Sequence, residues 1–317
     1  MNPNLPIFLQ PVFQERIWGG TKLNELFQYD IPSSTTGECW AVSAHPNGQS
    51  VVSGGPYAGL KLGELWTAHP ELFASKSAVF PLLTKILDAS DDLSVQVHPD
   101  DTYAGVHENG ELGKTECWYI VDAEPGASII YGHEAQSKEQ LVELIQEGKW
   151  NDLLTSIPVK AGDFFYVPSG TIHALGRGVV VLETQQSSDT TYRVYDYDRR
   201  DKDGNLRELH LEKAIAVTTI PQAYVAGSYD TRDADGLVVT SFVSNDFFTV
   251  EKWDVDGTAQ LPGGEQKYKI LSVIEGSGML RFDGQSYELP KGTHFILPVG
   301  FGSYELEGKL QLIVSNE

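Results

Sequence analysis

The feature of this sequence that most limits its fold is a tight turn between two short strands that ends in a histidine. Residues 162–173 read GDFFYVPSGTIH and have the spacing G-x5-P-x-G-x2-H. The aromatic and apolar residues 164–167 predict a strand, and Pro-Ser-Gly at 168–170 predicts the turn. His173 then lies on the returning strand, and the apolar residues 179–183 predict a further strand. This pattern favours a fold of short strands joined by turns.

The same spacing returns near the C-terminus without its histidine. Residues 292–303 repeat it, and Ser303 takes the last position. The strand predicted before this repeat, over residues 269–275, carries no metal ligand, and Gly-Ser-Gly at 276–278 predicts its turn. His294 lies at a different offset, and we interpret it as an ordinary surface or packed histidine. An internal repeat of this kind predicts two related units, of which only the first keeps a histidine.

Both copies resemble the second sequence signature of the cupin jelly roll, in which the histidine points into a small barrel and binds a metal. The resemblance implies a mainly β chain with two cupin-type jelly-roll barrels and a few inserted α-helices. We predict a catalytic, metal-binding cupin domain with helical insertions over residues 1–235. A degenerate cupin domain without metal ligands is predicted over residues 236–317. The helical periodicity is clearest over residues 137–150, where Ser137 and Gln140 fit a capping box.

Length and charge exclude several classes of function. The chain has 317 residues, enough for two domains, and a formal net charge of −21. Such a charge argues against nucleic acid and anionic membranes as partners. It also repels an anionic metabolite, so that a phosphate site needs a local basic cluster. The sequence pattern predicts no particular oligomeric state.

The cysteines and the apolar segments predict the compartment. Cys39 and Cys117 are the two cysteines of the sequence, too few for a disulfide framework. The first eleven residues, MNPNLPIFLQP, lack the basic and apolar regions of a signal peptide. No apolar run approaches the ~18 residues that cross a membrane. We therefore expect a cytoplasmic protein.

Two predicted strands carry polar side chains on one face. Alternation over residues 93–98 places Ser94, Gln96 and His98 on one side and three apolar residues on the other. This pattern is typical of a polar barrel interior or of an exposed sheet face. Over residues 113–121 the same alternation puts Lys114 and Glu116 on a shared face.

Gln96, His98, Glu116 and His173 are candidates for one metal site. Each alone is more simply interpreted as a polar residue satisfied by hydrogen bonds. Together, on inward faces of a cupin pattern, they favour a metal or catalytic site. Two imidazoles, one carboxylate and one amide oxygen suit zinc, although manganese, iron, nickel and cobalt accept the same ligands. We predict one Zn²⁺ per chain.

Three cations lie in or beside the same strands. Lys85 is surrounded by apolar residues over 80–88, and alone it is best interpreted as a lysine at a sheet edge. Lys114 is two residues from a proposed ligand, and Arg193 follows the last predicted strand of this region. A positive charge beside a metal is costly unless an anion arrives. The cluster therefore favours a charged substrate over a structural ion.

These motifs, in their order and separation, resemble the type I phosphomannose isomerases of the short bacterial form. The segments that carry the resemblance are QVHPDD at 96–101, GKTE at 113–116, PSGTIHA at 168–174, and Glu183 through Ser-Asp at 188–189 to Arg193. The C-terminal part is shorter than in the long fungal forms. Phosphate contacts that the long forms place there are therefore not transferred to this chain.

The resemblance implies a role for each candidate residue. His98, Glu116 and His173 would bind zinc, with Gln96 as a further ligand. Arg193 matches the family's catalytic arginine, and Lys85, Lys114 and Glu183 match active-site positions. Ser94 matches a position linked to phosphate binding.

The activity implied is the interconversion of mannose 6-phosphate and fructose 6-phosphate, by proton transfer between C2 and C1 through an enediol or enediolate. Glu183 and Lys114 both remain candidates for the base, and a lysine near zinc and an arginine would have its pKa lowered. Two other hypotheses are a cupin that binds a sugar without converting it and a metal-dependent oxygenase. Neither needs the cations together.

Overall fold

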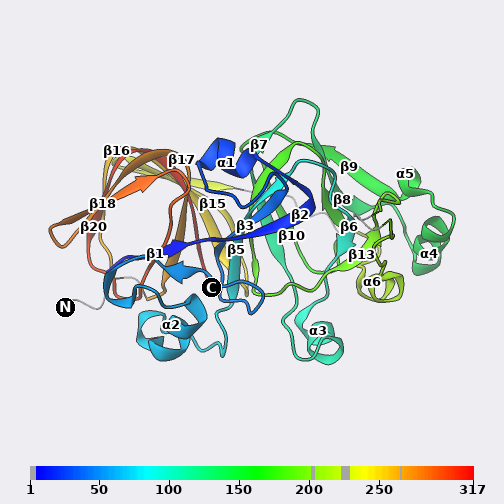
Figure 1. Ribbon diagram of the computed structural model, residues 1–317, viewed down its shortest axis with the longest axis horizontal. Helices are drawn as coiled ribbons and strands as arrows, with labels where there is room; N and C mark the ends of the chain where they lie inside the picture. Colours follow the sequence, from blue (N-terminus) through cyan, green and yellow to red (C-terminus); the bar gives the residue numbers. More distant parts are fainter. Residues whose placement is uncertain (1–4, 201–203, 223–228, 265) are drawn as a thin grey trace.

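The computed structural model describes residues 5–200, 204–222, 229–264 and 266–317. These residues form three antiparallel sheets with short helices at their margins (Figure 1). The six-stranded sheet has the order β10 (Phe164–Val167), β7 (Glu116–Ala123), β12 (Val179–Gln186), β5 (Leu82–Ala89), β3 (Thr36–Val42), β2 (Val12–Gly20). The five-stranded sheet has the order β13 (Tyr192–Tyr195), β6 (Val95–Val97), β11 (His173–Leu175), β8 (Ser128–His133), β9 (Leu154–Pro158).

The third sheet gathers the C-terminal strands and two strands from the start of the chain. Its order is β14 (Asp230–Ala234), β15 (Leu237–Ser244), β16 (Thr249–Leu261), β20 (Tyr304–Asn316), β17 (Lys269–Phe282), β19 (His294–Leu297), β1 (Ile7–Gln10), β4 (Val51–Val52). β18 (Gln285–Pro290) pairs with β17 beside this path. In Figure 1 this sheet occupies the left half of the molecule, and the other two sheets occupy the right half.

Helices lie outside the sheets. They are α1 (Lys22–Phe27), α2 (Leu62–Ala68), α3 (Asp101–His107), α4 (Lys138–Gln146), α5 (Trp150–Leu153) and α6 (Leu211–Val217), with 3-10 turns at Gly55–Tyr57 and Pro70–Leu72. The helix predicted over 137–150 is split, because Gly148 takes a positive φ of 64° that ends it. Ser137 Oγ caps α4 by accepting a hydrogen bond from the backbone N–H of Gln140. The side-chain oxygen of Gln140, however, accepts from the backbone N–H of Gln136 rather than from that of Ser137. The prediction of a mainly β chain with few helices is confirmed.

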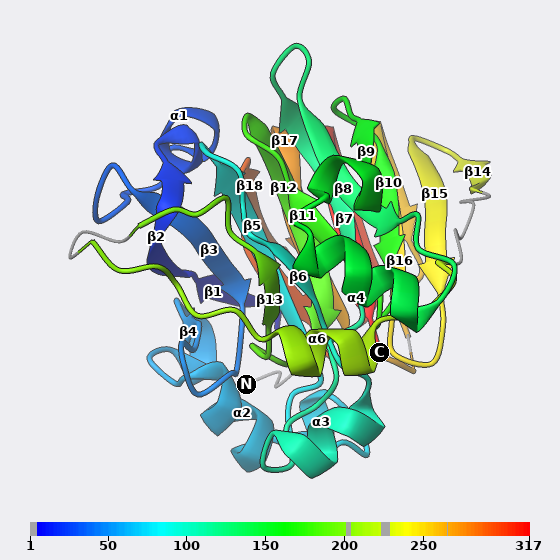
Figure 2. The same cartoon turned by 90° about the vertical axis from the view of Figure 1, so that its right-hand side faces the viewer.

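The layers follow from the period of two along each strand. Leu87, Ile120 and Val181 of the six-stranded sheet point toward the five-stranded sheet and pack against its Ile129 and Leu175. The outer face of the five-stranded sheet, with Val95 and Val97, is covered by α4, α5 and α6 (Figure 2). These apolar contacts fill only part of the space between the two sheets. The remaining inward positions are polar, as described below.

A second core joins the two halves of the molecule. The other face of the six-stranded sheet carries apolar side chains such as Ile86 and Leu182. They pack against Ile270, Ile296 and Ile313 of the C-terminal sheet. The division of the chain into two domains after residue 235 remains a prediction. The hydrogen bonds between strands cross this boundary. Strands β1, β4 and β14 precede that position and belong to the C-terminal sheet.

The predicted turn at residues 276–278 is wrong. Strand β17 runs without interruption from Lys269 to Phe282. Gly276 has a φ of +72°, and the pairing with β20 shifts register between Val273 and Glu275. A Cβ at Gly276 would lie 2.0 Å from the carbonyl oxygen of Lys309. The glycines therefore mark an irregularity within a long strand, where two backbones approach closely, rather than its end.

His294 is packed rather than exposed, with 1% of its surface accessible. Its ring lies 2.7 Å from the Tyr29 hydroxyl and 2.9 Å from Ser272 Oγ. Burial lowers the pKa of His294 from 6.5 to about 3. The unfolded chain therefore binds one more proton than the folded chain between these pH values, and stability is lost as the pH falls through this window.

We expect His294→Gln to remove this part of the pH dependence. Between pH 7.0 and 5.5 the free energy of unfolding of the unchanged protein should fall by about 1 kcal/mol more than that of the variant. Urea unfolding at both pH values measures the difference. His69→Gln, at a partly exposed histidine paired with Glu71, serves as the control. An equal loss in the His294→Gln and unchanged proteins would contradict the prediction.

None of the helices in the part of the chain that the structure describes has the length and apolar character needed to cross a bilayer.

Candidate metal centre and active site

Three neighbouring strands of the five-stranded sheet bring predicted site residues side by side. Gln96 on β6 is paired with His173 on β11 and with Arg193 on β13. Directly paired residues point to the same face of an antiparallel sheet. This face is the inner one, because Val97 and Ala174, the following residues on two of these strands, pack outward under the helices. The polar face predicted for Ser94, Gln96 and His98 is therefore an interior face.

A second row crosses the six-stranded sheet opposite the first. Lys85 on β5 is paired with Trp40 on β3 and with Glu183 on β12, and Glu183 is paired with Trp118 on β7. Lys85 Nζ lies 4.8 Å from the centroid of Trp40 and 3.8 Å from Glu183 Oε1. The interpretation of Lys85 as a sheet-edge lysine is wrong, because β5 lies between β3 and β12 and Lys85 is only 3% exposed.

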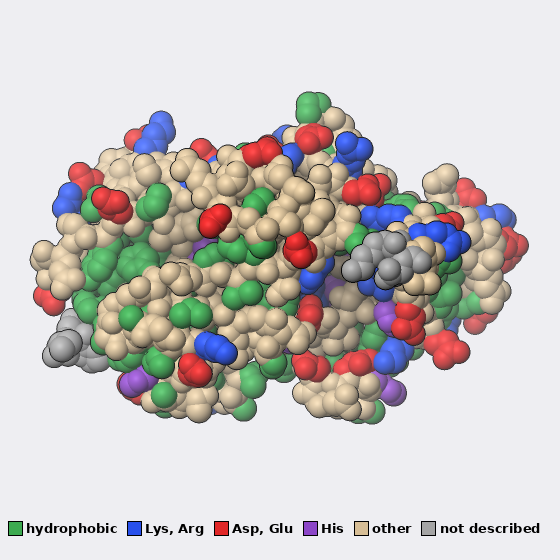
Figure 3. All heavy atoms as spheres, viewed as in Figure 1, with side chains coloured by type: hydrophobic (Ala, Val, Ile, Leu, Met, Phe, Trp, Pro, Cys, Tyr) green, Lys and Arg blue, Asp and Glu red, His purple; other side chains and the backbone are tan. Residues whose placement is uncertain are grey.

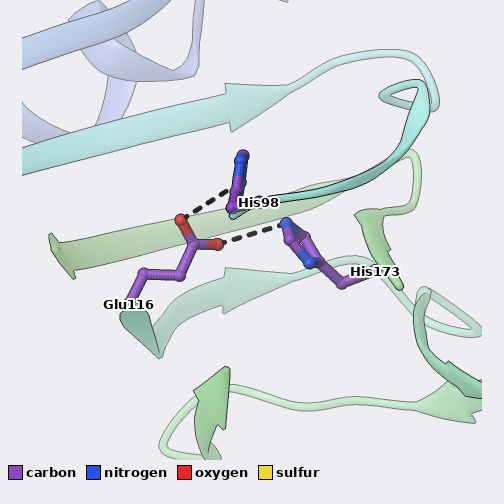
Figure 4. A group of neighbouring side chains, drawn as sticks. All are labelled: His98, Glu116 and His173. Atoms are coloured by element: carbon purple, nitrogen blue, oxygen red, sulfur yellow. Dashed lines mark ion pairs between the residues drawn. The ribbon is translucent and has the colours of Figure 1, made fainter. Parts of the chain in front are cut away.

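His98, Glu116 and His173 converge between the two rows (Figure 4). Glu116 Oε2 lies 3.6 Å from His98 Nε2, and Glu116 Oε1 lies 3.4 Å from His173 Nε2. The candidate ligand atoms all lie within 4.8 Å of one another, and all three residues are buried. Among the described residues this is the group of histidine and acidic side chains that can hold a metal.

The hydrogen bonds around these side chains fit a metal site. His98 Nδ1 lies 2.8 Å from the Thr190 carbonyl oxygen, and His173 Nδ1 lies 2.8 Å from the Thr171 carbonyl oxygen. A carbonyl only accepts, so each Nδ1 carries the proton and each Nε2 directs a lone pair at the centre. Glu116 Oε1 is buried with no hydrogen-bond donor among the described residues. These atoms present the lone pairs that a divalent cation requires.

Burial is the largest cause that lowers the pKa of both histidines, and the nearby charge of Lys114 is the next. The pKa of His173 falls to about 4, and that of His98 falls well below its ordinary value. Both rings are therefore neutral near pH 7. Neutral imidazole is the form that binds a metal.

Gln96 lies beside this group. Its Nε2 is 3.4 Å from His173 Nε2. The terminal amide is nearly symmetric in shape, and a half turn presents its oxygen in the same place. Its role as a fourth ligand remains a prediction.

Lys114 connects the three residues to the rest of the site. Its Nζ hydrogen-bonds to Glu116 Oε2 and lies 3.1 Å from His98 Nε2 and 3.9 Å from Glu183 Oε1. Burial acts to lower the pKa of Lys114, but the charges of Glu116 and Glu183 outweigh it and the pKa is raised. The sequence led us to expect a lowered pKa for Lys114 from a metal and an arginine. The residues of the chain itself instead raise this pKa. They keep Lys114 protonated.

The two carboxylate oxygens of Glu183 have different neighbours. Its Oε2 accepts a hydrogen bond of 3.0 Å from Trp118 Nε1, and its Oε1 faces Lys85 and Lys114. Burial raises the pKa of Glu183, and the charge of Glu116 raises it further. Trp118 therefore fixes the carboxylate in one orientation and leaves the other oxygen free to act on a bound molecule.

A pocket of about 330 Å³ opens onto Lys114 and Glu183. Six predicted site residues line it, and they are Lys85, Ser94, Gln96, Lys114, Glu183 and Arg193. Arg193 Nε donates to Ser94 Oγ at 3.3 Å, and its NH1 donates to the Glu208 carbonyl at 2.8 Å. Figure 3 shows Lys and Arg side chains gathered on the right-hand half of the face, the half that contains this pocket.

Sequence reasoning missed part of the pocket lining. The unassigned residues are Arg16, Trp18, Glu38, Leu87, Leu93, Asp189, Thr191 and Arg207. Alternation along residues 14–18 places Arg16 on the same face as Trp18, which is a signal that was available. Arg207 lies in a loop before α6, where no periodicity points to a role.

Comparison with known proteins agrees with this geometry. The chain matches the family model of the phosphomannose isomerase type I catalytic domain over residues 7–121 and that of the mannose-6-phosphate isomerase cupin domain over residues 238–317. It is 53% identical over 312 residues to mannose-6-phosphate isomerase ManA of Bacillus subtilis, and this alignment covers 98% of each chain. The chain belongs to the type I phosphomannose isomerase family. It is also 56% identical over 312 residues to a mannose-6-phosphate isomerase of Streptococcus mutans, again covering 98% of each chain.

Solved phosphomannose isomerases share the fold. The crystal structure of the mannose 6-phosphate isomerase from Bacillus subtilis superimposes with a TM-score of 0.96 at 53% identity, over 98% of this chain and 99% of that chain. A phosphomannose isomerase variant from Salmonella typhimurium superimposes with a TM-score of 0.80 at 16% identity, over 99% of this chain and 100% of that chain. Membership of the phosphomannose isomerase family and the His98, Glu116 and His173 group together imply a bound metal. The predicted family and the mainly β fold are confirmed.

Proposed function

We propose that this chain interconverts mannose 6-phosphate and fructose 6-phosphate. The observation that carries the proposal is one pocket that is lined by the buried carboxylate of Glu183 and by several cations. It lies beside the buried metal-ligand group, because the lining residues Lys114 and Gln96 contact that group. The names of its close relatives support the same activity. The two cysteines are free and buried, which supports a reducing compartment such as the cytoplasm.

The ligand set favours zinc. His98 and His173 supply two imidazole nitrogens, Glu116 supplies a carboxylate, and Gln96 is placed to add an amide oxygen. Lys114 Nζ contacts two of these ligand atoms, Glu116 Oε2 and His98 Nε2, so its ammonium and a bound cation would compete for them. The bound metal supplies Lewis-acid stabilisation of negative charge on the sugar oxygens.

Glu183 is the base in this proposal. In the direction from open-chain mannose 6-phosphate, its Oε1 takes the proton from C2 and returns it to C1, so that the carboxylate ends as it began. Lys114 gives a proton to the C1 oxygen and takes the proton of the C2 hydroxyl, which leaves a carbonyl at C2. Trp118 holds the other carboxylate oxygen and so keeps Glu183 aimed at the sugar.

Three further side chains bind and stabilise the sugar. Arg193 keeps its charge at all relevant pH values and stabilises the enediolate by charge-assisted hydrogen bonds. Lys85 lies 3.8 Å from Glu183 and offsets the negative charge of the carboxylate. Ser94 lies at the other end of the β6 face from His98, about 13 Å along the strand. This spacing suits a substrate whose reacting end and phosphate end lie far apart.

A coupled assay of mannose 6-phosphate conversion tests the proposal. The rate is measured before and after chelation and again with zinc added back. We expect activity to fall at least about 100-fold on chelation and to return with zinc, because a Lewis acid contributes several kcal/mol to the transition state. Absence of turnover with stoichiometric metal bound would support a sugar-binding cupin instead.

A further inference from the structure

The pocket carries local positive charge in a strongly acidic protein. Its lining holds five cationic and three acidic side chains, a formal excess of two positive charges, whereas the whole chain has a net charge of −21. Two of the cations, Lys85 and Lys114, are committed to Glu183 and Glu116 inside the site. The other three are arginines, and one of them is Arg193. The remaining two, Arg16 and Arg207, have no role in the chemistry described above.

The exposed fractions of these side chains order them from floor to mouth. The side chains of Lys85 and Lys114 are 4% and 5% exposed, whereas those of Arg16 and Arg207 are 31% and 23% exposed. A molecule whose carbonyl end reaches Glu183 on the floor therefore presents its far end to the two arginines. For a hexose 6-phosphate, the far end is the phosphate.

Each of the two arginines is held by a buried carboxylate, and one of these carboxylates, Glu38, also lines the pocket. Arg207 Nε and NH2 donate to the two oxygens of Asp196 at 2.7 and 2.5 Å, and Asp196 is 5% exposed. Arg16 NH2 donates to Glu38 Oε2 at 2.8 Å, and the same oxygen accepts from Trp40 Nε1 at 2.7 Å. A guanidinium has five N–H donors, more than one carboxylate can use. Both side chains are therefore fixed in place with donors to spare.

Arg193 and Arg207 repel each other. Burial is the largest cause that lowers the pKa of Arg193, and the positive charge of Arg207 is the next. An anion that binds between two guanidinium groups reduces their mutual repulsion. A phosphate monoester carries a charge of about −1.5 to −2 and three strong acceptor oxygens, which match forked guanidinium donors.

We propose that Arg16 and Arg207 form, with Ser94, the phosphate-binding end of the pocket and thereby select phosphorylated over free sugars. The inference rests on the proposed function, because the sugar must enter with its carbonyl end toward Glu183. It assigns the two arginines to recognition of the phosphate and leaves the proton transfer to the residues on the floor.

Arg16→Gln and Arg207→Gln test the proposal. Loss of one hydrogen bond to a charged group costs about 1.5–3 kcal/mol, so each change should raise KM for mannose 6-phosphate by about 10-fold or more, with a much smaller effect on kcat. The double variant should show a larger rise than either alone. Arg281→Gln is the matched control, since Arg281 is also paired with a glutamate, on the C-terminal sheet. Its KM should equal that of the unchanged protein.

A second readout does not depend on turnover. Calorimetric titration with inorganic phosphate should show binding to the unchanged and Arg281→Gln proteins and at least about 10-fold weaker binding to the double variant. Equal KM values and equal phosphate binding in all proteins would overturn the proposal while leaving the isomerase activity intact. If the unchanged protein binds phosphate through these arginines but does not convert mannose 6-phosphate, the proposed function fails and the anion site stands.

Conservative variants keep the proposal testable if a glutamine variant does not fold. Arg16→Lys and Arg207→Lys retain the charge and lose the forked donors. We expect them to raise KM and weaken phosphate binding, by less than glutamine does. Lysine variants with unchanged KM and unchanged phosphate binding would overturn the assignment of forked recognition.

Discussion

Replacing His173 with alanine is expected to remove the bound metal and, with it, turnover. His173 supplies one of two neutral imidazole nitrogens in the group, and its orientation is fixed by the hydrogen bond from Nδ1 to the Thr171 carbonyl. Alanine removes one of the two imidazole nitrogens and leaves Glu116 and Gln96 with a single histidine, a weaker ligand set for a divalent cation. Metal content after dialysis, measured by atomic emission, and kcat in the coupled assay check the prediction. The rate should fall at least about 100-fold.

His133→Ala is the matched control for His173→Ala. His133 is also buried, lies on β8 next to β11, and has a ring nitrogen 3.0 Å from a backbone carbonyl, that of Thr219. It is not part of the ligand group. We expect the His133→Ala protein to keep its metal. His98→Ala should behave as His173→Ala does, and stoichiometric metal retained in either variant would exclude that residue from the ligand set.

Replacing Glu183 with glutamine is expected to lower kcat by about 100- to 10,000-fold, the range that general-base catalysis contributes. Glutamine has nearly the same shape and can keep the hydrogen bond from Trp118, so the pocket should stay intact. It cannot take a proton from carbon. Incorporation of deuterium from D₂O into the sugar, followed by NMR, reports the proton transfer directly and should cease with turnover.

The same measurement on Lys114→Gln separates the two candidate bases. If Glu183 is the base, Lys114→Gln slows turnover but retains some deuterium incorporation, whereas Glu183→Gln abolishes it. The opposite result would assign the base to Lys114. Glu124→Gln controls for loss of a paired carboxylate, because Glu124 forms an ion pair with Lys22 and is 55% exposed. Its kcat should not change.

The period of two made most of the site predictable. It placed Gln96 and His98 on one face and Lys114 and Glu116 on another, and the structure brings His98 and Glu116 to one centre with His173. Alternation alone left the inner and outer faces undetermined, because a polar face suits either a barrel interior or solvent. The helices over Val95 and Val97 settle this, and no local pattern encodes their position.

The environments of Lys85, Arg207 and Gly276 could not be predicted from their neighbours in sequence. Lys85 is buried because Glu183 and Trp40 flank it on neighbouring strands, a pairing that depends on sheet order. Arg207 reaches the pocket from a loop that Asp196 anchors. Gly276 looks like a turn residue in sequence, but a long strand passes through it beside Lys309. In each case the deciding partner is distant or on another strand.

The pairing of β1 with β19 bears on how the chain folds during synthesis. Ile7 is paired with Ile296, so β1 leaves the ribosome long before its partner strand β19 has been synthesised. Until then the apolar back of the six-stranded sheet, with Ile86 and Leu182, lacks the C-terminal residues that cover it. A nascent chain released early would carry a nearly complete catalytic pocket on an uncovered hydrophobic sheet and would tend to aggregate. The C-terminal strands therefore protect the chain from aggregation rather than complete the pocket, whose lining ends at Arg207.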